Sequence, residues 1–494
     1  MKENRAYQII QWVLWGLLIL SLPITSFPLI ADRLGAMVSP AAIIPLVLLI
    51  LAWWLPDLIQ GGSLPRQSLP LLGFVAVALV SSLISLFREI PPFQDALPWR
   101  QVLEGFTTLL IGVAFFLLSS SWPRSEKSIH FTLRLLNYAG LIILVWCIIQ
   151  WIVWNEYTRW PEWLRDIQKM FSSGTLYKDR ITGFAYEPSW LAHQLNMIFI
   201  PFWLASTVKG FTVHRRKFLG ISLENFLLVG GVILLYLSKS RLGLLAFLLC
   251  VSYLLLRLSI KIVRILQARF KTRAAKQWTA ITFYLGLVVL SVLLLLGTGV
   301  YLSKADPRMS ELFDFETLRN RPFLEYAEKL AFSARIVYWQ AGWNVFGENP
   351  FLGVGLGNAG FYFYDKLDPA AWEYFEIRDV MYDLASPPNI KSLWVRLFAE
   401  TGFIGSAFFI VWLGLILLSG ISLLRQSKKY MQVTGMAVIL TLLGLLVEGF
   451  SVDTFALPYF WITFGLGVAV FRHQEQAEPE VPVVPSVIEP ISQG

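Results

Sequence analysis

Long apolar runs alternate with short polar connections along almost the whole chain. A helix needs about 20 mainly apolar residues to cross the roughly 30 Å hydrocarbon core of a bilayer. Runs of this kind lie at 9–31, 38–56, 69–87, 101–120, 132–154, 186–207, 221–237, 241–258, 278–302, 394–420, 432–449 and 455–471. The pattern therefore predicts an all-α, polytopic transmembrane helical protein with about 12 spans.

Two long segments interrupt the apolar pattern. Residues 155–185 contain the amphipathic stretch 163–171, which predicts a helix that lies in the membrane interface or packs on the protein's own surface. The other segment, 303–393, is the largest loop and has helical patterning around 323–346. The predicted organisation is helices 1–9 in 1–302, a large partly helical loop at 303–393, helices 10–12 in 394–472, and a Pro- and Glu-rich disordered tail at 473–494.

The composition agrees with a membrane protein. Hydrophobic residues make up 56% of the chain and charged residues 15%, whereas soluble domains carry roughly 25% charged residues. Cys147 and Cys250 both lie inside apolar runs, where a cysteine behaves as a small hydrophobic residue. Neither a disulfide framework nor a metal site is therefore expected from them.

The basic residues indicate how the helices are oriented. With the N-terminus in the cytoplasm, the Lys and Arg clusters at 66, 124–127, 209–217, 257–276 and 425–429 all fall in cytoplasmic loops. The same parity places 155–185 and 303–393 outside, and the C-terminus in the cytoplasm. The net charge of +8 is thus an orientation signal, and no nucleic-acid partner is expected.

Ionisable residues at a membrane boundary are costly unless they face water or a cavity, so they are the first candidates for function. In the segment 180–189, Arg180 and Tyr186-Glu187-Pro188 lead into the sixth span. Pro188 suits the first turn of a helix and Glu187 would sit beside its positive end. Two interpretations stay open: the segment only starts the helix, or Glu187 is a functional carboxylate.

A second candidate is Ser238-Lys239-Ser240-Arg241, the tight outer connection between two apolar helices. Its two cations either reach the lipid headgroups or form an anion site, because arginine can bind phosphate oxygens with two parallel hydrogen bonds.

Two further candidates flank the tenth span. Arg335 precedes a glycine-rich run, 353–360, that includes the letters of a dinucleotide fingerprint. No strand–helix–strand unit surrounds the run, so we expect the glycines to allow sharp turns or close backbone approach. Beyond it come Asn389, Lys391, Arg396 and Glu400. Arg396 and Glu400 are four residues apart and could pair on one helix face.

These motifs together resemble the O-antigen ligase and O-antigen polymerase superfamily. The resemblance rests on Ser240-Arg241, Arg335, Asn349-Pro350-x-x-Gly353-Val354-Gly355 and Glu400-Thr401-Gly402-x-Ile404-Gly405, and covers roughly residues 180–410. It implies a metal-independent, inverting glycosyltransferase without a cofactor, in the bacterial inner membrane with its active site at the periplasmic face. The implied substrates are an undecaprenyl-pyrophosphate-linked glycan and an acceptor glycolipid.

The resemblance leaves the acceptor open. Ligases transfer the glycan to the lipid A core and carry a histidine nine residues before the Glu of Glu-Thr-Gly, whereas here that position is Lys391. The Tyr-Glu-Pro-Ser segment looks more like exopolysaccharide polymerases, so polymerase ranks above ligase. A flippase and a chain-length regulator are the implied partner proteins. A polyprenyl-linked glycan flippase or transporter is the alternative of another class, which would favour repeated halves.

The site hypothesis assigns Glu187 as the base, and Arg241 and Arg335 as the residues that hold the pyrophosphate. The supporting pyrophosphate- or substrate-binding residues are Arg180, Tyr186, Lys239, Asn389, Lys391 and Arg396.

Overall fold

The computed structural model describes residues 5–34, 37–156, 159–214, 216–270, 272–305, 332–382 and 386–477. These residues form helices joined by turns, and the described part of the chain has no β-strand, only isolated bridges between Ser26 and Ser39 and between Phe218 and Ile221. The predicted all-α class is confirmed.

The first half of the chain contains α1 (Arg5–Leu20), α2 (Pro28–Leu34), α3 (Ile43–Leu49), the π-helix η1 (Ile50–Trp54), α4 (Leu55–Ile59), α5 (Ser68–Ser85), α6 (Pro98–Ser121), α7 (Glu126–Glu156), α8 (Glu162–Phe171), α9 (Pro188–Gln194), the π-helix η2 (Leu195–Phe199), α10 (Ile200–Lys209) and α11 (Leu223–Leu237). The second half contains α12 (Arg241–Gln267), α13 (Arg273–Ala305), α17 (Ser333–Glu348), the 3-10 helix η4 (Ala359–Tyr362), α18 (Phe363–Lys366), the 3-10 helix η5 (Pro369–Glu373), α19 (Phe375–Tyr382), α20 (Leu393–Leu424), α21 (Lys429–Glu448) and α22 (Tyr459–Ala477).

Each predicted apolar run coincides with one helix or with consecutive helices. Six helices within the described residues, α5, α6, α7, α12, α20 and α21, are long and apolar enough to cross a membrane, and shorter apolar helices lie at Arg5–Leu20, Ile43–Ile59 and Leu223–Leu237. The chain is therefore a polytopic helical membrane protein, while the total of about 12 spans stays a prediction.

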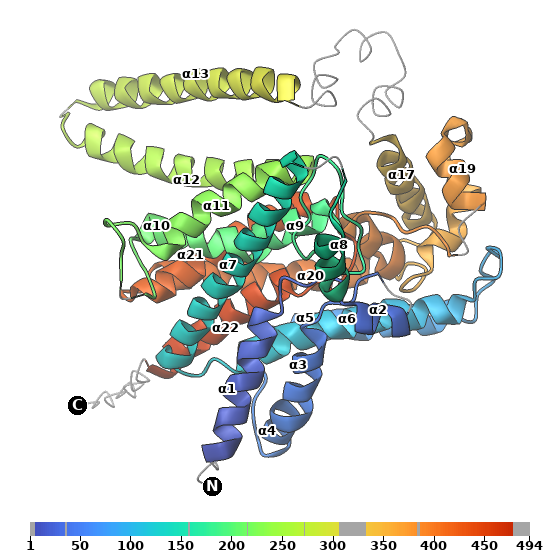
Figure 1. The fold of residues 1–494 in the computed structure, drawn as a ribbon. Helices are drawn as coiled ribbons and strands as arrows, with labels where there is room; N and C mark the ends of the chain where they lie inside the picture. The colour runs from blue at the N-terminus through green and yellow to red at the C-terminus, as the bar shows by residue number, and fades with distance from the viewer. Residues whose placement is uncertain are drawn as a thin grey trace, which may run out of the picture.

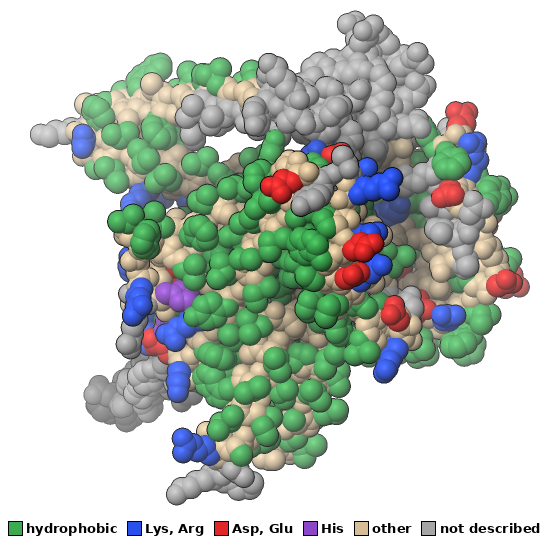
Figure 2. Space-filling view, viewed as in Figure 1, with side chains coloured by type: hydrophobic (Ala, Val, Ile, Leu, Met, Phe, Trp, Pro, Cys, Tyr) green, Lys and Arg blue, Asp and Glu red, His purple; other side chains and the backbone are tan. Residues whose placement is uncertain are grey.

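The centre of the bundle is a packed aromatic core. Trp412 of α20 lies 5.1 Å from Trp461 of α22 and 5.3 Å from Phe409, measured between ring centroids, and all three side chains are buried. Figure 1 shows α5, α20, α21 and α22 running side by side through the body, with α12 and α13 as an antiparallel pair along one side. Hydrophobic side chains cover the middle of the visible face, and charged side chains gather toward its two ends (Figure 2). This distribution suits a bilayer-spanning body.

The two ends of the bundle differ. The elements of the long loop, α17 and α19, lie together at the right-hand end in Figure 1, whereas the α12–α13 turn and the end of α22 lie at the left. This is the separation that the predicted topology requires, with the long loop on one side and basic turns on the other. Which end faces the cytoplasm is still the sequence prediction.

The amphipathic stretch forms α8, which packs on the protein. Leu164 and Gln168 are buried, and the Trp146 indole Nε1 of α7 donates to Gln168 Oε1 at 3.0 Å. Trp163 and Met170 on the other face are exposed. One face of α8 therefore packs on the protein's own surface, which is the second of the two predicted alternatives. Its other face presents apolar side chains outward.

The predicted start of the disordered tail at 473 is wrong. Helix α22 continues to Ala477, since Gln474, Glu475 and Ala477 are residues that favour helices and the first helix breaker is Pro479. Residues 478–494, for which disorder was also predicted, lie outside the described residues, as do residues 323–331 of the predicted loop helix.

Candidate functional site

Helix α20 is interrupted at Gly402, whose backbone has φ 63° and ψ −168°. An interruption leaves backbone donors and acceptors without helical partners. The segment 350–355 supplies them: the amides of Val354 and Gly355 donate to the carbonyls of Ala399 and Glu400 at 3.0 and 2.9 Å, and the amides of Phe403 and Ile404 donate to the carbonyls of Pro350 and Phe351 at 2.7 and 3.2 Å. The two motifs that carry the resemblance are thus one structural unit.

The glycines of the 353–360 run allow this close packing. Gly353 has φ 68°, and a Cβ there would lie 2.5 Å from the backbone carbon of Glu400. Gly357 has φ 79°, and a Cβ there would lie 2.4 Å from the carbonyl oxygen of Gln101 on α6. The prediction that the run serves backbone approach rather than dinucleotide binding therefore agrees with the geometry.

Three of the predicted basic residues contact residues 451–453, between α21 and α22, two of them through their guanidinium groups and Lys391 through its backbone amide. Arg335 Nη1 donates to the carbonyl of Ser451 at 3.2 Å, and the Lys391 amide donates to Asp453 Oδ2 at 3.0 Å. Arg396 Nη1 donates to the carbonyl of Asp453 at 2.6 Å. Arg335, Lys391 and Arg396, far apart in sequence, are thus tied to one segment, and they are defined here as the 451 group; the Lys391 ammonium itself lies over the Tyr338 ring, 4.9 Å from its centroid.

The predicted pair between Arg396 and Glu400 forms, with Nε and Oε2 2.8 Å apart. Both side chains are nearly buried, at 13% and 6% exposure. Arg396 is therefore held by its neighbours, and only part of its guanidinium is available for a ligand.

A cavity of about 200 Å³ adjoins the 451 group. Its polar lining residues are Gln101, Glu104, Thr108, Asn389, Arg396, Glu400, Asp453 and Thr454. This mixture of carboxylates, amides and hydroxyls with one guanidinium suits a neutral ligand rich in hydroxyl groups better than a polyanion. Of these residues, the sequence hypothesis included Asn389 and Arg396 and missed Glu104 and Asp453.

The other predicted cations lie at the α11–α12 connection, defined here as the 239 group. Arg180 Nε donates to the carbonyl of Ser238 at 2.9 Å, and the Ile181 amide donates to the carbonyl of Leu237 at 3.3 Å. The loop 155–185 is thereby tied to the turn that carries Lys239 and Arg241. Within that turn Ser240 caps α12, because its hydroxyl accepts from the Gly243 amide at 3.3 Å.

Glu187 stands directly before α9 and is half-buried. Its carboxylate accepts a hydrogen bond from the Ser189 hydroxyl and makes none with the backbone amides of the first turn. It lies close to Tyr177: burial raises the pKa of that phenol, the Glu187 carboxylate adds to the rise, and Arg180 opposes it. The Arg180 guanidinium carbon lies 6.0 Å from the centroid of the Tyr177 ring, and the Glu187 side chain is not used as a cap.

Tyr186, the residue before Glu187, is held in place on both sides. Its amide donates to Thr25 Oγ1 at 2.8 Å, and its ring packs 5.3 Å from that of Trp190. These two contacts fix the position of the Tyr186–Glu187 backbone.

Asn196 links the two basic groups through the interior. Its Nδ2 donates to the carbonyl of Gly243 and to Glu448 Oε1, each at 2.8 Å. Gly243 is two residues beyond Arg241, and Glu448 is three residues before Ser451. His193 Nδ1 lies 3.7 Å from the second oxygen of Glu448 in the same buried cluster. The sequence analysis missed this link, because nothing in the sequence pairs residues 196 and 448.

Replacing Asn196 by alanine is expected to destabilise the protein. The change leaves Oε1 of the buried Glu448 carboxylate without its Asn196 donor, which costs about 1–3 kcal/mol. The measurement is the thermal unfolding midpoint in detergent. The control is Asn225→Ala, which removes the acceptor of a hydrogen bond from the exposed Thr207 hydroxyl. Equal midpoints for the two variants would contradict the structural importance of the link.

The described residues contain no group of three or more His, Cys, Asp or Glu side chains placed to hold a metal ion.

Fold and site together define a polytopic helical membrane protein with a polar, partly basic site at one end of its bundle. Residues 226–410 match the family model described as O-antigen ligase, and no curated protein matches the chain. The matched segment includes Arg241, Arg335 and the part of α20 that carries the interruption at Gly402. The match confirms the resemblance to the O-antigen ligase and polymerase superfamily, a family of glycosyltransferase-type enzymes that build polysaccharides.

Proposed function

We propose that the protein is an inverting glycosyltransferase that polymerises undecaprenyl-pyrophosphate-linked repeat units at the periplasmic membrane face. The observation that carries the proposal is that the family match includes Arg241 and Arg335 together with Asn389 and Arg396, and that the latter two line a cavity whose polar side chains suit sugars. One-sided chemistry of this kind needs a site at one end of the bundle, which is where these elements lie.

The donor pyrophosphate is assigned to the two basic groups. Arg241 and Arg335 bind its oxygens, with Arg180, Lys239 or Lys391 adding positive charge. Guanidinium–phosphate hydrogen bonds are charge-assisted and are often paired, so they stabilise negative charge that develops on a leaving pyrophosphate. The polyprenyl tail lies between helices, against apolar side chains.

The acceptor glycan is assigned to the polar cavity, with its attacking hydroxyl next to Glu187. Glu187 takes the proton from the acceptor hydroxyl while the hydroxyl oxygen attacks the anomeric carbon. The bond between that carbon and the phosphate oxygen breaks on the opposite face, so the configuration inverts and the pyrophosphate leaves on its carrier. Asn389 and Arg396, in the cavity lining, hold sugar hydroxyls.

The direct test offers lipid-linked repeat units alone to the protein in nanodiscs and resolves the products by size. A polymerase gives a ladder of lengthened lipid-linked glycans. Arg241→Ala or Arg335→Ala is expected to lower the rate about 10–100-fold, since each change removes charge-assisted hydrogen bonds to the leaving group. Arg378→Ala on α19 is the control, because its guanidinium contacts the carbonyl of Trp372 and lies in neither basic group. Unchanged rates in both test variants would reject the assignment of the arginines.

The second candidate function is O-antigen ligase, which the description of the matching family favours. It predicts that the donor stays unextended alone and is consumed when lipid A core is added. The flippase alternative receives no support from the family match.

A further inference from the structure

A second polar cavity, of about 260 Å³, lies far from the candidate site. The candidate site uses Glu104 and Thr108 near the start of α6, whereas Ser120 and Ser121 at the end of α6 line this cavity. The 16 residues from Glu104 to Ser120 correspond to about 24 Å of helix. The two cavities therefore lie toward opposite ends of the bundle.

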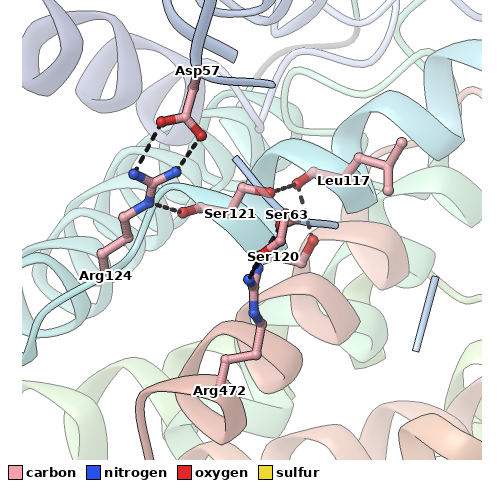
Figure 3. Close-up of polar contacts among 7 residues, drawn as sticks. All are labelled: Asp57, Ser63, Leu117, Ser120, Ser121, Arg124 and Arg472. Carbon is pink, nitrogen blue, oxygen red and sulfur yellow. Dashed lines mark hydrogen bonds and ion pairs between the residues drawn. The ribbon is translucent and has the colours of Figure 1, made fainter. Parts of the chain in front are cut away.

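Arg124, in the connection between α6 and α7, and Arg472 of α22 both line this cavity, and Figure 3 shows their polar contacts. Arg124 donates to both oxygens of Asp57, at 3.1 and 2.5 Å, and through Nε to the carbonyl of Ser121 at 3.1 Å. Arg472 uses Nη2 alone, donating to the carbonyl and the hydroxyl of Ser63 at 3.2 and 3.0 Å. Within the described residues, Arg472 has no carboxylate within ion-pair distance.

The N–H donors that remain available for a ligand in the cavity belong mainly to the two guanidinium groups. A guanidinium has five N–H groups; Arg124 uses three of them in the bonds above and Arg472 two. The hydroxyls of Ser120 and Ser121 already donate to the carbonyl of Leu117, as Figure 3 shows. Arginine N–H groups therefore dominate what the cavity offers to a ligand.

The charge of the cavity is unbalanced. Arg124 and Arg472 both line it, and none of the described residues in its lining is an aspartate or glutamate, while the Asp57 carboxylate pairs with Arg124. An anion in the cavity would relieve the repulsion between the two guanidiniums.

We propose that this cavity binds the phosphate group of an anionic phospholipid headgroup. Basic pockets between the ends of transmembrane helices bind such headgroups, and arginine matches the geometry of phosphate. The cavity is smaller than the roughly 300–1,000 Å³ of typical ligand pockets, which suits a headgroup phosphate. Its end of the bundle carries the basic turns that the sequence analysis assigns to the cytoplasm. Inorganic phosphate shares the same chemistry, and the test separates the two sources.

The test titrates detergent-purified full-length protein with phosphatidylglycerol, phosphatidylcholine or inorganic phosphate and follows the thermal unfolding midpoint. Phosphatidylglycerol is expected to raise the midpoint of the wild type more than phosphatidylcholine does. Arg472→Gln is expected to weaken the apparent phosphatidylglycerol affinity about 10-fold or more, because it removes charge-assisted donors. Arg425→Gln, an exposed arginine in the α20–α21 turn outside the cavity, is the control and is expected to bind as the wild type does.

Other outcomes are also decisive. Equal protection by inorganic phosphate, lost in Arg472→Gln, would overturn the lipid source in favour of a free phosphate. Equal phosphatidylglycerol affinity for wild type and Arg472→Gln would overturn the site. Arg472→Lys, which keeps the charge and loses the planar fork, is the second variant in case the glutamine variant does not fold, and it is expected to bind more weakly than the wild type.

Discussion

Glu187→Gln is expected to lower the rate of glycan transfer about 10²–10⁴-fold, the range that general-base catalysis contributes. The amide has nearly the same shape as the carboxylate and can still accept the hydrogen bond from the Ser189 hydroxyl, but it cannot take a proton from an acceptor sugar. Because Arg241 and Arg335, to which pyrophosphate binding is assigned, are unchanged, donor binding should change much less than the rate of the chemical step.

The measurement is the initial rate of ladder formation at several donor concentrations, so that kcat and KM are separated. Glu162→Gln is the matched control, since Glu162 is a carboxylate of the same loop that lies exposed at the start of α8. A Glu187→Gln variant with wild-type kcat would move the role of base to another carboxylate. Glu104 and Asp453, which line the polar cavity, would then be tested in the same way.

The helices were predictable because one physical constraint dominates a membrane chain. Backbone polar groups must be paired inside the bilayer, so every long apolar run becomes a helix. The run at 69–87 became α5 (Ser68–Ser85), and the run at 101–120 became α6 (Pro98–Ser121). The predicted boundary at 473 was wrong because the tail's Pro- and Glu-rich composition begins only at Glu478-Pro479, whereas residues 473–477 are polar yet favour helices.

The site was predictable only where its residues are close in sequence. Arg396 and Glu400 are one helical turn apart, and their pairing follows from that spacing. Asn196 and Glu448 are 252 residues apart, and the sequence has no periodicity that joins them. Asp453 contributes its backbone carbonyl to Arg396 and its carboxylate to the Lys391 amide, and only the folded chain places it there.

The interrupted helix also lay beyond sequence reasoning. Residues 394–420 read as one continuous apolar run, and a glycine within such a run is compatible with an unbroken helix. What breaks α20 is the segment 350–355, whose backbone hydrogen bonds replace those that an unbroken helix would make around Gly402. The family motifs pointed to both segments, and the structure explains why they occur together.

Gly402→Ala is expected to destabilise the protein by about 3 kcal/mol or more and to lower activity with it. At φ 63° and ψ −168° the backbone has a conformation that is essentially restricted to glycine. An added Cβ would also lie 2.3 Å from the carbonyl carbon and oxygen of Phe351, so the docked segment 350–355 would have to move. That segment supports the loop 353–360 and the wall of the polar cavity to which Gly357 and Glu400 contribute.

The measurement is the temperature at which the detergent-purified protein loses its monodisperse profile in size-exclusion chromatography. Gly414→Ala is the matched control in the same helix, because a Cβ there meets nothing within 4 Å, and alanine in a regular helix is neutral or slightly stabilising. If both variants lose the profile at the same temperature, the interruption at Gly402 is not required for the fold.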